Sequence, residues 1–173
     1  MTHTYNEDLA RAQLKTTMLT VEDVGQVHDY ERYAEAWDEY VKFFAYKVGD
    51  MSILRGWTIA LERLQGKSER EAQEGFGGPG EKSIVEATYM YRIRGYHAVN
   101  DKWESGKKFT TLTLQVLAAL NAEPNLHSSN REGGASGIFY GPPVHDVPFD
   151  FRMFGDIVCH YSNIVYSLSE VLQ

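Results

Sequence analysis

The sequence predicts an α+β fold with a mixed, mainly antiparallel sheet and helices packed on one face of it. Residues 51–64 and 84–99 alternate apolar and polar side chains, which is typical of strands. Residues 31–46 and 101–122 instead repeat apolar side chains at intervals of three and four, which is typical of helices. Strand-like segments twice follow one another without a helix between them, which favours antiparallel hairpins. The predicted order is α-β-α-β-β-α-β-β.

Length and composition favour one globular domain over residues 1–173. Hydrophobic residues make up 43% and charged residues 24%, so the chain can bury a core. A net charge of −7 argues against non-specific nucleic-acid binding and against a polybasic membrane surface. We also expect no membrane contact, because no apolar run approaches the roughly 18 residues of a spanning helix. The single cysteine, Cys159, excludes an internal disulfide.

The first half of the chain begins with a helical pattern over residues 5–19, in which Asn6 supplies a capping oxygen. A short extended segment follows at 25–30, and then the helix at 31–46. Residues 51–64 read as a strand whose apolar face includes Trp57, with Arg55 and Arg63 at the ends of that face. Residues 65–83 contain five glycines among charged side chains and read as a long flexible loop.

The second half opens with the clearest strand, 84–99, and the strongest helix, 101–122, which Pro124 stops. Residues 125–148 read as a second flexible loop rich in glycine and proline. Two strand candidates follow at 149–154 and 157–172, with Gly155 and Asp156 at the turn. The apolar parity of the last strand changes near Asn163, which indicates either a bulge there or two covered faces.

The sequence contains no motif that predicts a catalytic, cofactor-binding or metal-ligating residue. The six histidines show no zinc-binding spacing. Two His-Asp dipeptides occur, but adjacent residues of a strand point to opposite faces. Cys159 lies in an apolar strand and is expected to be an inert, buried thiol. A small hydrolase or ligand-binding enzyme stays open as an alternative, provided that four side chains converge in one pocket: His28, Asp29, His145 and Asp146.

Aromatic residues make up 13% of the chain, including eleven tyrosines. They suit both an aromatic core and a contact surface, because tyrosine and tryptophan tolerate desolvation while keeping a polar group. The polar face of the strand at 84–99 carries two arginines beside tyrosines and is a candidate for pairing between subunits. The candidate interface residues are Arg55, Trp57, Arg92, Arg94, Phe76, Phe139 and Tyr140.

The order of three stretches resembles small structural proteins of siphophage type, in particular the tail terminator and neck proteins of long-tailed phages. The likeness spans about residues 10–172. The stretches are 25–33 with the Trp37-bearing helix and 55–59, then 89–98 with the helix that runs into 117–124, and finally 141–144 with 151–161.

The resemblance implies a virion protein and no enzyme: a subunit of a ring, expected to hold six copies, between the tail tube protein and the head–tail connector or head completion protein. It would be made in the host cytoplasm. DNA would pass through the lumen without specific binding, which an acidic subunit suits because negative charge repels phosphate. An adaptor that binds a host protein through its aromatic face stays open as a further alternative.

Overall fold

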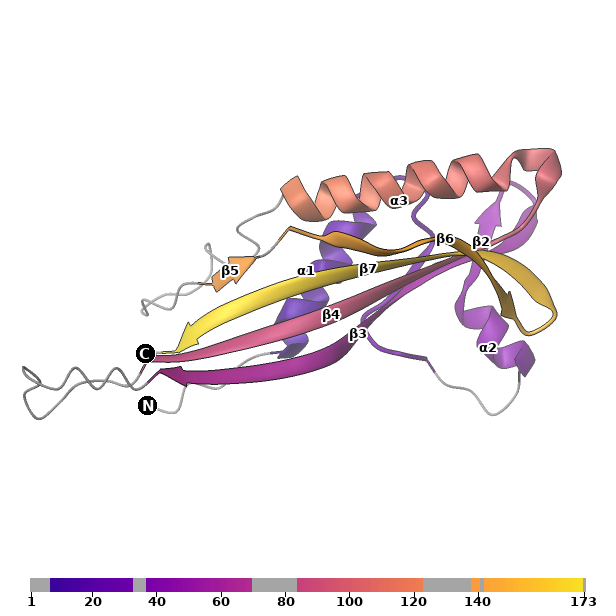
Figure 1. Cartoon of the computed structure of the whole chain (residues 1–173). Helices are drawn as coiled ribbons and strands as arrows, with labels where there is room; N and C mark the ends of the chain where they lie inside the picture. Colours follow the sequence, from indigo (N-terminus) through magenta and orange to yellow (C-terminus); the bar gives the residue numbers. More distant parts are fainter. Residues whose placement is uncertain (1–6, 33–36, 70–83, 123–137, 141, 173) are drawn as a thin grey trace, which may run out of the picture.

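The computed structural model describes residues 7–32, 37–69, 84–122, 138–140 and 142–172. Figure 1 shows long strands running the length of the molecule with helices alongside them. In chain order the elements are α1 (Glu7–Leu19), β1 (Gln26–His28), α2 (Trp37–Phe43), β2 (Ala45–Val48), β3 (Met51–Glu69), β4 (Ile84–Ala98), the 3-10 helix η1 (Asp101–Trp103), α3 (Ser105–Ala122), β5 (Ile138–Tyr140), β6 (Val144–Phe154) and β7 (Ile157–Leu172).

The strands form one seven-stranded sheet in the order β1-β3-β4-β7-β5, with β2 also paired to β3 and β6 also paired to β7. The β1–β3 pair is parallel and every other pair is antiparallel. The prediction of an α+β fold with a mixed, mainly antiparallel sheet is therefore confirmed.

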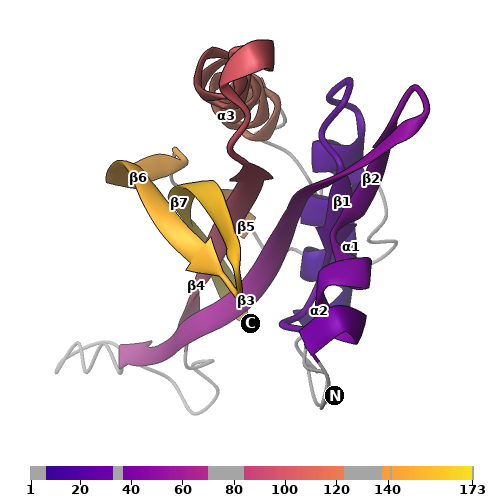
Figure 2. The same cartoon turned by 90° about the vertical axis from the view of Figure 1, so that its right-hand side faces the viewer.

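The helices α1 and α3 lie on the same side of the sheet and cover the main core (Figures 1 and 2). Because strand side chains alternate between faces, every second residue of β3, β4 and β7 enters this core. Trp57 stacks on Phe109 of α3 with ring centroids 6.0 Å apart. The fully buried large side chains of this core are Trp57, Tyr91, Tyr166, Phe109, Met18, Ile59, Ile93, Leu120, Ile164 and Val116.

We call the side of the sheet opposite to α1 and α3 the outer face. A smaller apolar cluster covers one end of this face. Phe44, Leu54, Phe154 and Cys159 form this cluster. Val41 and Phe43 of α2 pack against it. The expectation that helices pack on one face only is therefore wrong for α2, whose apolar side chains follow the second cluster rather than the main core.

The helix expected at 31–46 is shorter in the structure, because a β-hairpin takes its last residues. Ala45–Val48 form β2, which pairs with residues 51–54 of β3 across a turn at Gly49 and Asp50. Gly49 has a φ of +60°, the left-handed conformation that such tight turns require. The tight Gly-Asp turn therefore outweighs the helical periodicity here.

Both long loops expected from glycine content are partly strand. β3 continues through Glu69, and residues 65–69 pair with 84–88 of β4. In the second segment, Ile138–Tyr140 form β5 and β6 begins at Val144. Backbone pairing does not depend on apolar side chains, which is why periodicity misses these extensions. Near Asn163 the register of β7 with β4 is unbroken and four consecutive residues are buried, so both faces are covered there.

Candidate interaction surface

The hairpin of β6 and β7 carries a patch of exposed apolar side chains. In the part of the chain that the structure describes, β6 pairs with β7 on one side and has no strand on its other side. We call Phe149, Phe151, Met153 and Val158 the hairpin patch; Phe151 is 62% and Met153 is 64% exposed. The register places them on the α3 side of the sheet. An edge strand with exposed apolar groups is a template for association with another chain.

Contacts with the core hold the hairpin patch in place. The ring of Phe149 lies 6.1 Å from that of Phe109, and the ring of Phe151 lies 5.1 Å from that of His160. Ser105 Oγ, which accepts a hydrogen bond from the amide of Asn100, donates to His160 Nε2 at 2.9 Å. The start of α3 is thereby fixed to β7 beside the patch, and a partner would meet a preorganised surface.

The outer face presents a paired-charge surface. Arg92 Nε donates to Glu62 Oε2 at 2.8 Å, and Arg94 forms an ion pair with Glu31. The Arg92–Glu62 hydrogen bond raises the pKa of Arg92. Since all four side chains are partly exposed, these pairs contribute little to stability and remain accessible to a partner. The placement of Arg92 and Arg94 fits their prediction as interface residues, which stays a prediction.

The two other predicted interface residues of β3 lie inside the protein. Trp57 has no exposed surface, and its indole Nε1 donates to the carbonyl of Val24 at 3.0 Å. Arg55 is only 7% exposed. Both therefore contradict the expectation of an outer contact surface, because odd-numbered residues of this part of β3 face the core under α3. Phe76 and the side chains of Phe139 and Tyr140 lie outside the described residues.

The residues of the alternative enzyme hypothesis do not form one site. His28 pairs with Thr58 on β3 and faces the outer side, whereas His145 pairs with Ile164 and faces α3. The sheet separates them, with β3, β4 and β7 between their strands. Burial lowers the pKa of each imidazole. These four residues therefore cannot act together as an acid–base site.

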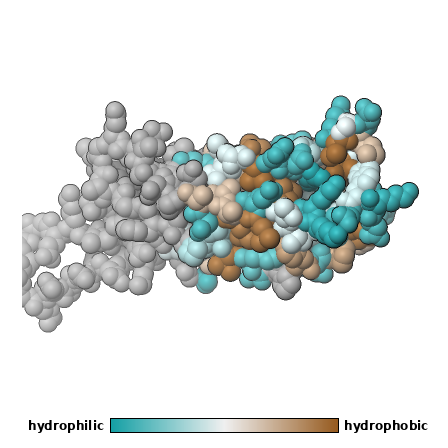
Figure 3. Space-filling view, turned by 90° about the horizontal axis from the view of Figure 1, so that it is seen from above, coloured by the Kyte–Doolittle hydropathy of each residue, from teal (hydrophilic) through white to brown (hydrophobic). Residues whose placement is uncertain are grey.

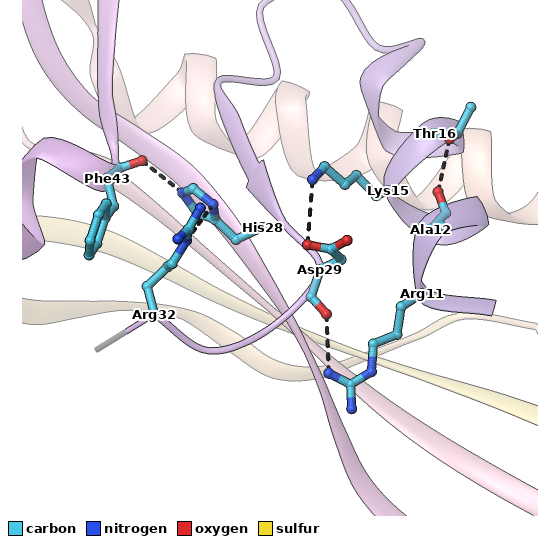
Figure 4. A network of polar contacts seen from close by, with 8 residues as sticks. All are labelled: Arg11, Ala12, Lys15, Thr16, His28, Asp29, Arg32 and Phe43. Atoms are coloured by element: carbon cyan, nitrogen blue, oxygen red, sulfur yellow. Dashed lines mark hydrogen bonds and ion pairs between the residues drawn. The ribbon is translucent and has the colours of Figure 1, made fainter. Parts of the chain in front are cut away.

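Local hydrogen bonds give His28 and Asp29 a structural role (Figure 4). His28 Nε2 donates to the carbonyl of Phe43 at 2.7 Å, and Arg32 Nε donates to His28 Nδ1 at 3.2 Å. Lys15 of α1 lies 3.4 Å from the Asp29 carboxylate. The end of β1 is thereby tied to α1 and to the end of α2. At the opposite edge of the sheet, His145 Nε2 lies 2.9 Å from Ser162 Oγ, and the side-chain amide of Asn163 donates to the Asp146 carboxylate at 3.0 Å.

Among the described residues, no three His, Cys, Asp or Glu side chains come together as a metal site. Cys159 is buried, and burial raises the pKa of its thiol to about 12, so it is protonated at neutral pH. No helix in the described ranges has the length and hydropathy needed to cross a membrane.

Sequence reasoning missed the hairpin patch. Phe149, Phe151 and Met153 alternate as the apolar face of a buried strand would, and alternation alone does not tell a core face from an exposed one. Viewed from the α3 side in Figure 3, hydrophobic surface is broken into patches between hydrophilic side chains.

Comparison with protein-family models and with curated proteins finds no match for this chain.

Proposed function

We propose that the protein is a virion structural subunit of the tail-terminator or neck type, which assembles into a ring, caps the tail tube and joins it to the head connector. The observation that carries the proposal is the hairpin patch on the unpaired edge strand β6. Removing apolar surface from water contributes about 25 cal/mol per Å². An exposed apolar patch of this kind therefore favours association with another chain. The resemblance in the order of the sequence motifs adds support.

The positions of the sheet edges support the proposal of a ring. The hairpin of β6 and β7 lies at one side of the sheet, and β1 and β2 lie at the other, beyond β3. If the hairpin of one copy contacts the β2 side of the next, the contact is head-to-tail. Such a contact closes into a ring when its rotation completes a full turn. The ring would present one surface to the tail tube and the other to the head connector.

The charge of the chain suits a conduit for DNA. Each copy carries a net charge of −7. A ring of such copies repels phosphate groups, so DNA moves through the lumen without being held. The ion-paired outer face, with Arg92 matched by Glu62 and Arg94 by Glu31, leaves no excess positive charge on these four residues to bind DNA.

Sedimentation velocity over a range of protein concentrations tests the assembly. We expect one discrete oligomer, and we expect Phe151→Asp to shift it to the monomer because the charge enters the contact. Leu114→Asp is the matched control, since Leu114 is 58% exposed on α3, outside the hairpin patch. A monomer at every concentration, or equal loss of assembly in both variants, would overturn the proposal.

A further inference from the structure

A pocket of about 290 Å³ lies where the β2–β3 hairpin, the end of β4 and the start of α3 meet. Its size is near the lower end for small-molecule sites. The pocket is distinct from the hairpin patch, with which it shares no residue. One wall is apolar and is made by Val48, Met51, Ile53 and Trp103.

The other wall is cationic. Arg55 and Lys108 line it, and none of the described residues that line the pocket carries a carboxylate. Arg55 Nη1 donates to the carbonyl of Asp23 at 3.0 Å, but Arg55 Nε has no partner among the described residues. The Asp23 carboxylate accepts a hydrogen bond from the hydroxyl of Tyr46 at 2.9 Å, and its negative charge also favours the charged form of Arg55. Burial nevertheless outweighs this favourable charge and lowers the pKa of Arg55, so an anionic ligand in the pocket would offset the remaining cost of burying the guanidinium.

His97 does not neutralise this charge. It is 3% exposed, and its Nε2 accepts a hydrogen bond from Arg55 Nη2 at 3.4 Å. Its Nδ1 has no partner among the described residues. Burial, followed by the charge of Arg55, lowers the pKa of His97 to about 4. The imidazole is therefore neutral at physiological pH. It neither adds to the positive charge of Arg55 nor offsets it.

Helix α3 adds to the positive potential of the pocket. Ser105, its first residue, lines the pocket, and the helix is 18 residues long. The N-terminal end of a helix carries a partial positive charge. A neighbouring hollow of about 390 Å³ shares Arg55, His97 and Lys108 but is also lined by Glu22 and Asp23. The first pocket is therefore the better site for an anion.

We propose that this pocket binds a carboxylate attached to a small apolar group. The carboxylate would pair with Arg55 and Lys108, and the apolar group would lie against Met51, Ile53 and Trp103. A planar guanidinium matches a carboxylate geometrically. The apolar wall favours this ligand over inorganic phosphate, which has no apolar part to bury. The site is independent of the proposed role in a ring.

The probe is hydrocinnamate, and hydrocinnamyl alcohol is its neutral counterpart. NMR of the indole N–H groups reports the site, because the chain has three tryptophans and Trp103 lines the pocket whereas Trp57 is buried in the core. We expect hydrocinnamate to move the Trp103 signal with a dissociation constant on the order of 1 mM, and the alcohol to bind at least about tenfold more weakly.

Lys108→Gln removes one positive charge from the pocket. Because Lys108 is exposed, the variant should fold. Its affinity for hydrocinnamate should fall about fivefold. Lys102→Gln is the matched control, because Lys102 is exposed on η1 and does not line the pocket. Equal binding of acid and alcohol, equal effects of the two substitutions, or tighter binding of inorganic phosphate than of hydrocinnamate would overturn the proposal.

Discussion

The indole of Trp57 lies directly across Gly95 on the neighbouring strand. The two residues are register partners in the β3–β4 pair. A Cβ atom added to Gly95 would lie 2.4 Å from Trp57 Cζ3, closer than any real contact. The glycine thus makes room for the tryptophan between β4 and Phe109 of α3, with which Trp57 stacks.

Gly95→Ala should therefore destabilise the protein by about 2 kcal/mol, as overpacking in a core commonly does. Urea unfolding followed by circular dichroism measures this loss. In a Trp57→Leu background the same substitution should cost less, because the clashing ring is gone. Equal costs in both backgrounds would show that the tryptophan does not set the requirement for glycine.

The buried His97 predicts a loss of stability in acid. Its pKa in the folded protein, about 4, lies below the ordinary histidine value of 6.5, so the unfolded chain binds more protons between these two pH values. Stability from this group is present above pH 6.5 and falls as the pH drops toward 4, by about 3 kcal/mol in total. Burial lowers the pKa values of His28, His145 and His160 in the same direction.

Unfolding free energies of wild type and His97→Gln, measured between pH 7 and pH 4, test the assignment. The wild type should lose more stability over this interval than the variant, since the remaining histidines are common to both. Parallel pH profiles would show that His97 is not the group responsible.

The ion pair of Arg92 and Glu62 should matter more for assembly than for folding. Both side chains are about one-third exposed, so Arg92→Ala should change the free energy of unfolding by less than about 1 kcal/mol. If the outer face contacts another subunit, Arg92→Glu should weaken the oligomer while leaving the melting temperature of the monomer almost unchanged. Sedimentation and thermal unfolding of the same samples separate the two effects; an intact oligomer would remove the outer face from the contact.

Two leucines of α3, one inside the apolar stripe and one outside it, offer a matched pair of substitutions. Leu120 is 1% exposed in the main core, whereas Leu114 on the same helix is 58% exposed. Leu120→Asp should destabilise the fold by more than about 3 kcal/mol, because a charge enters the core, and Leu114→Asp should have little effect. Similar melting temperatures for the two variants would contradict the placement of α3.

Long elements with strong periodicity were predictable from the sequence. The strand at 84–99 and the helix at 101–122 correspond to β4 and to η1 with α3, because one covered face imposes a clear period on the side chains. The turn at Gly155 and Asp156 was also predicted correctly. Three extended segments were missed, since residues 65–69, 138–140 and 144–148 are held by backbone pairing.

The candidate surface was less predictable than the fold. Trp57 and Phe151 both occupy apolar positions of alternating strands, yet one is fully buried and the other is 62% exposed. What separates them is the position of each strand in the sheet: β3 lies under the helices, whereas β6 lies at an edge. Strand order depends on contacts between distant segments, which local periodicity does not encode. The pairing of Arg55 with His97, 42 residues apart, was hidden for the same reason.

The proposed role in capping a tail tube is tested most directly by electron microscopy of tail tubes polymerised with and without this protein. The tube protein is taken from the phage genome in which, on this proposal, the chain is encoded. We predict that the protein binds as a ring at one end of each tube and stops its growth, and that Phe151→Asp does neither. Tubes of unchanged length with bare ends in the presence of the wild-type protein would contradict the account.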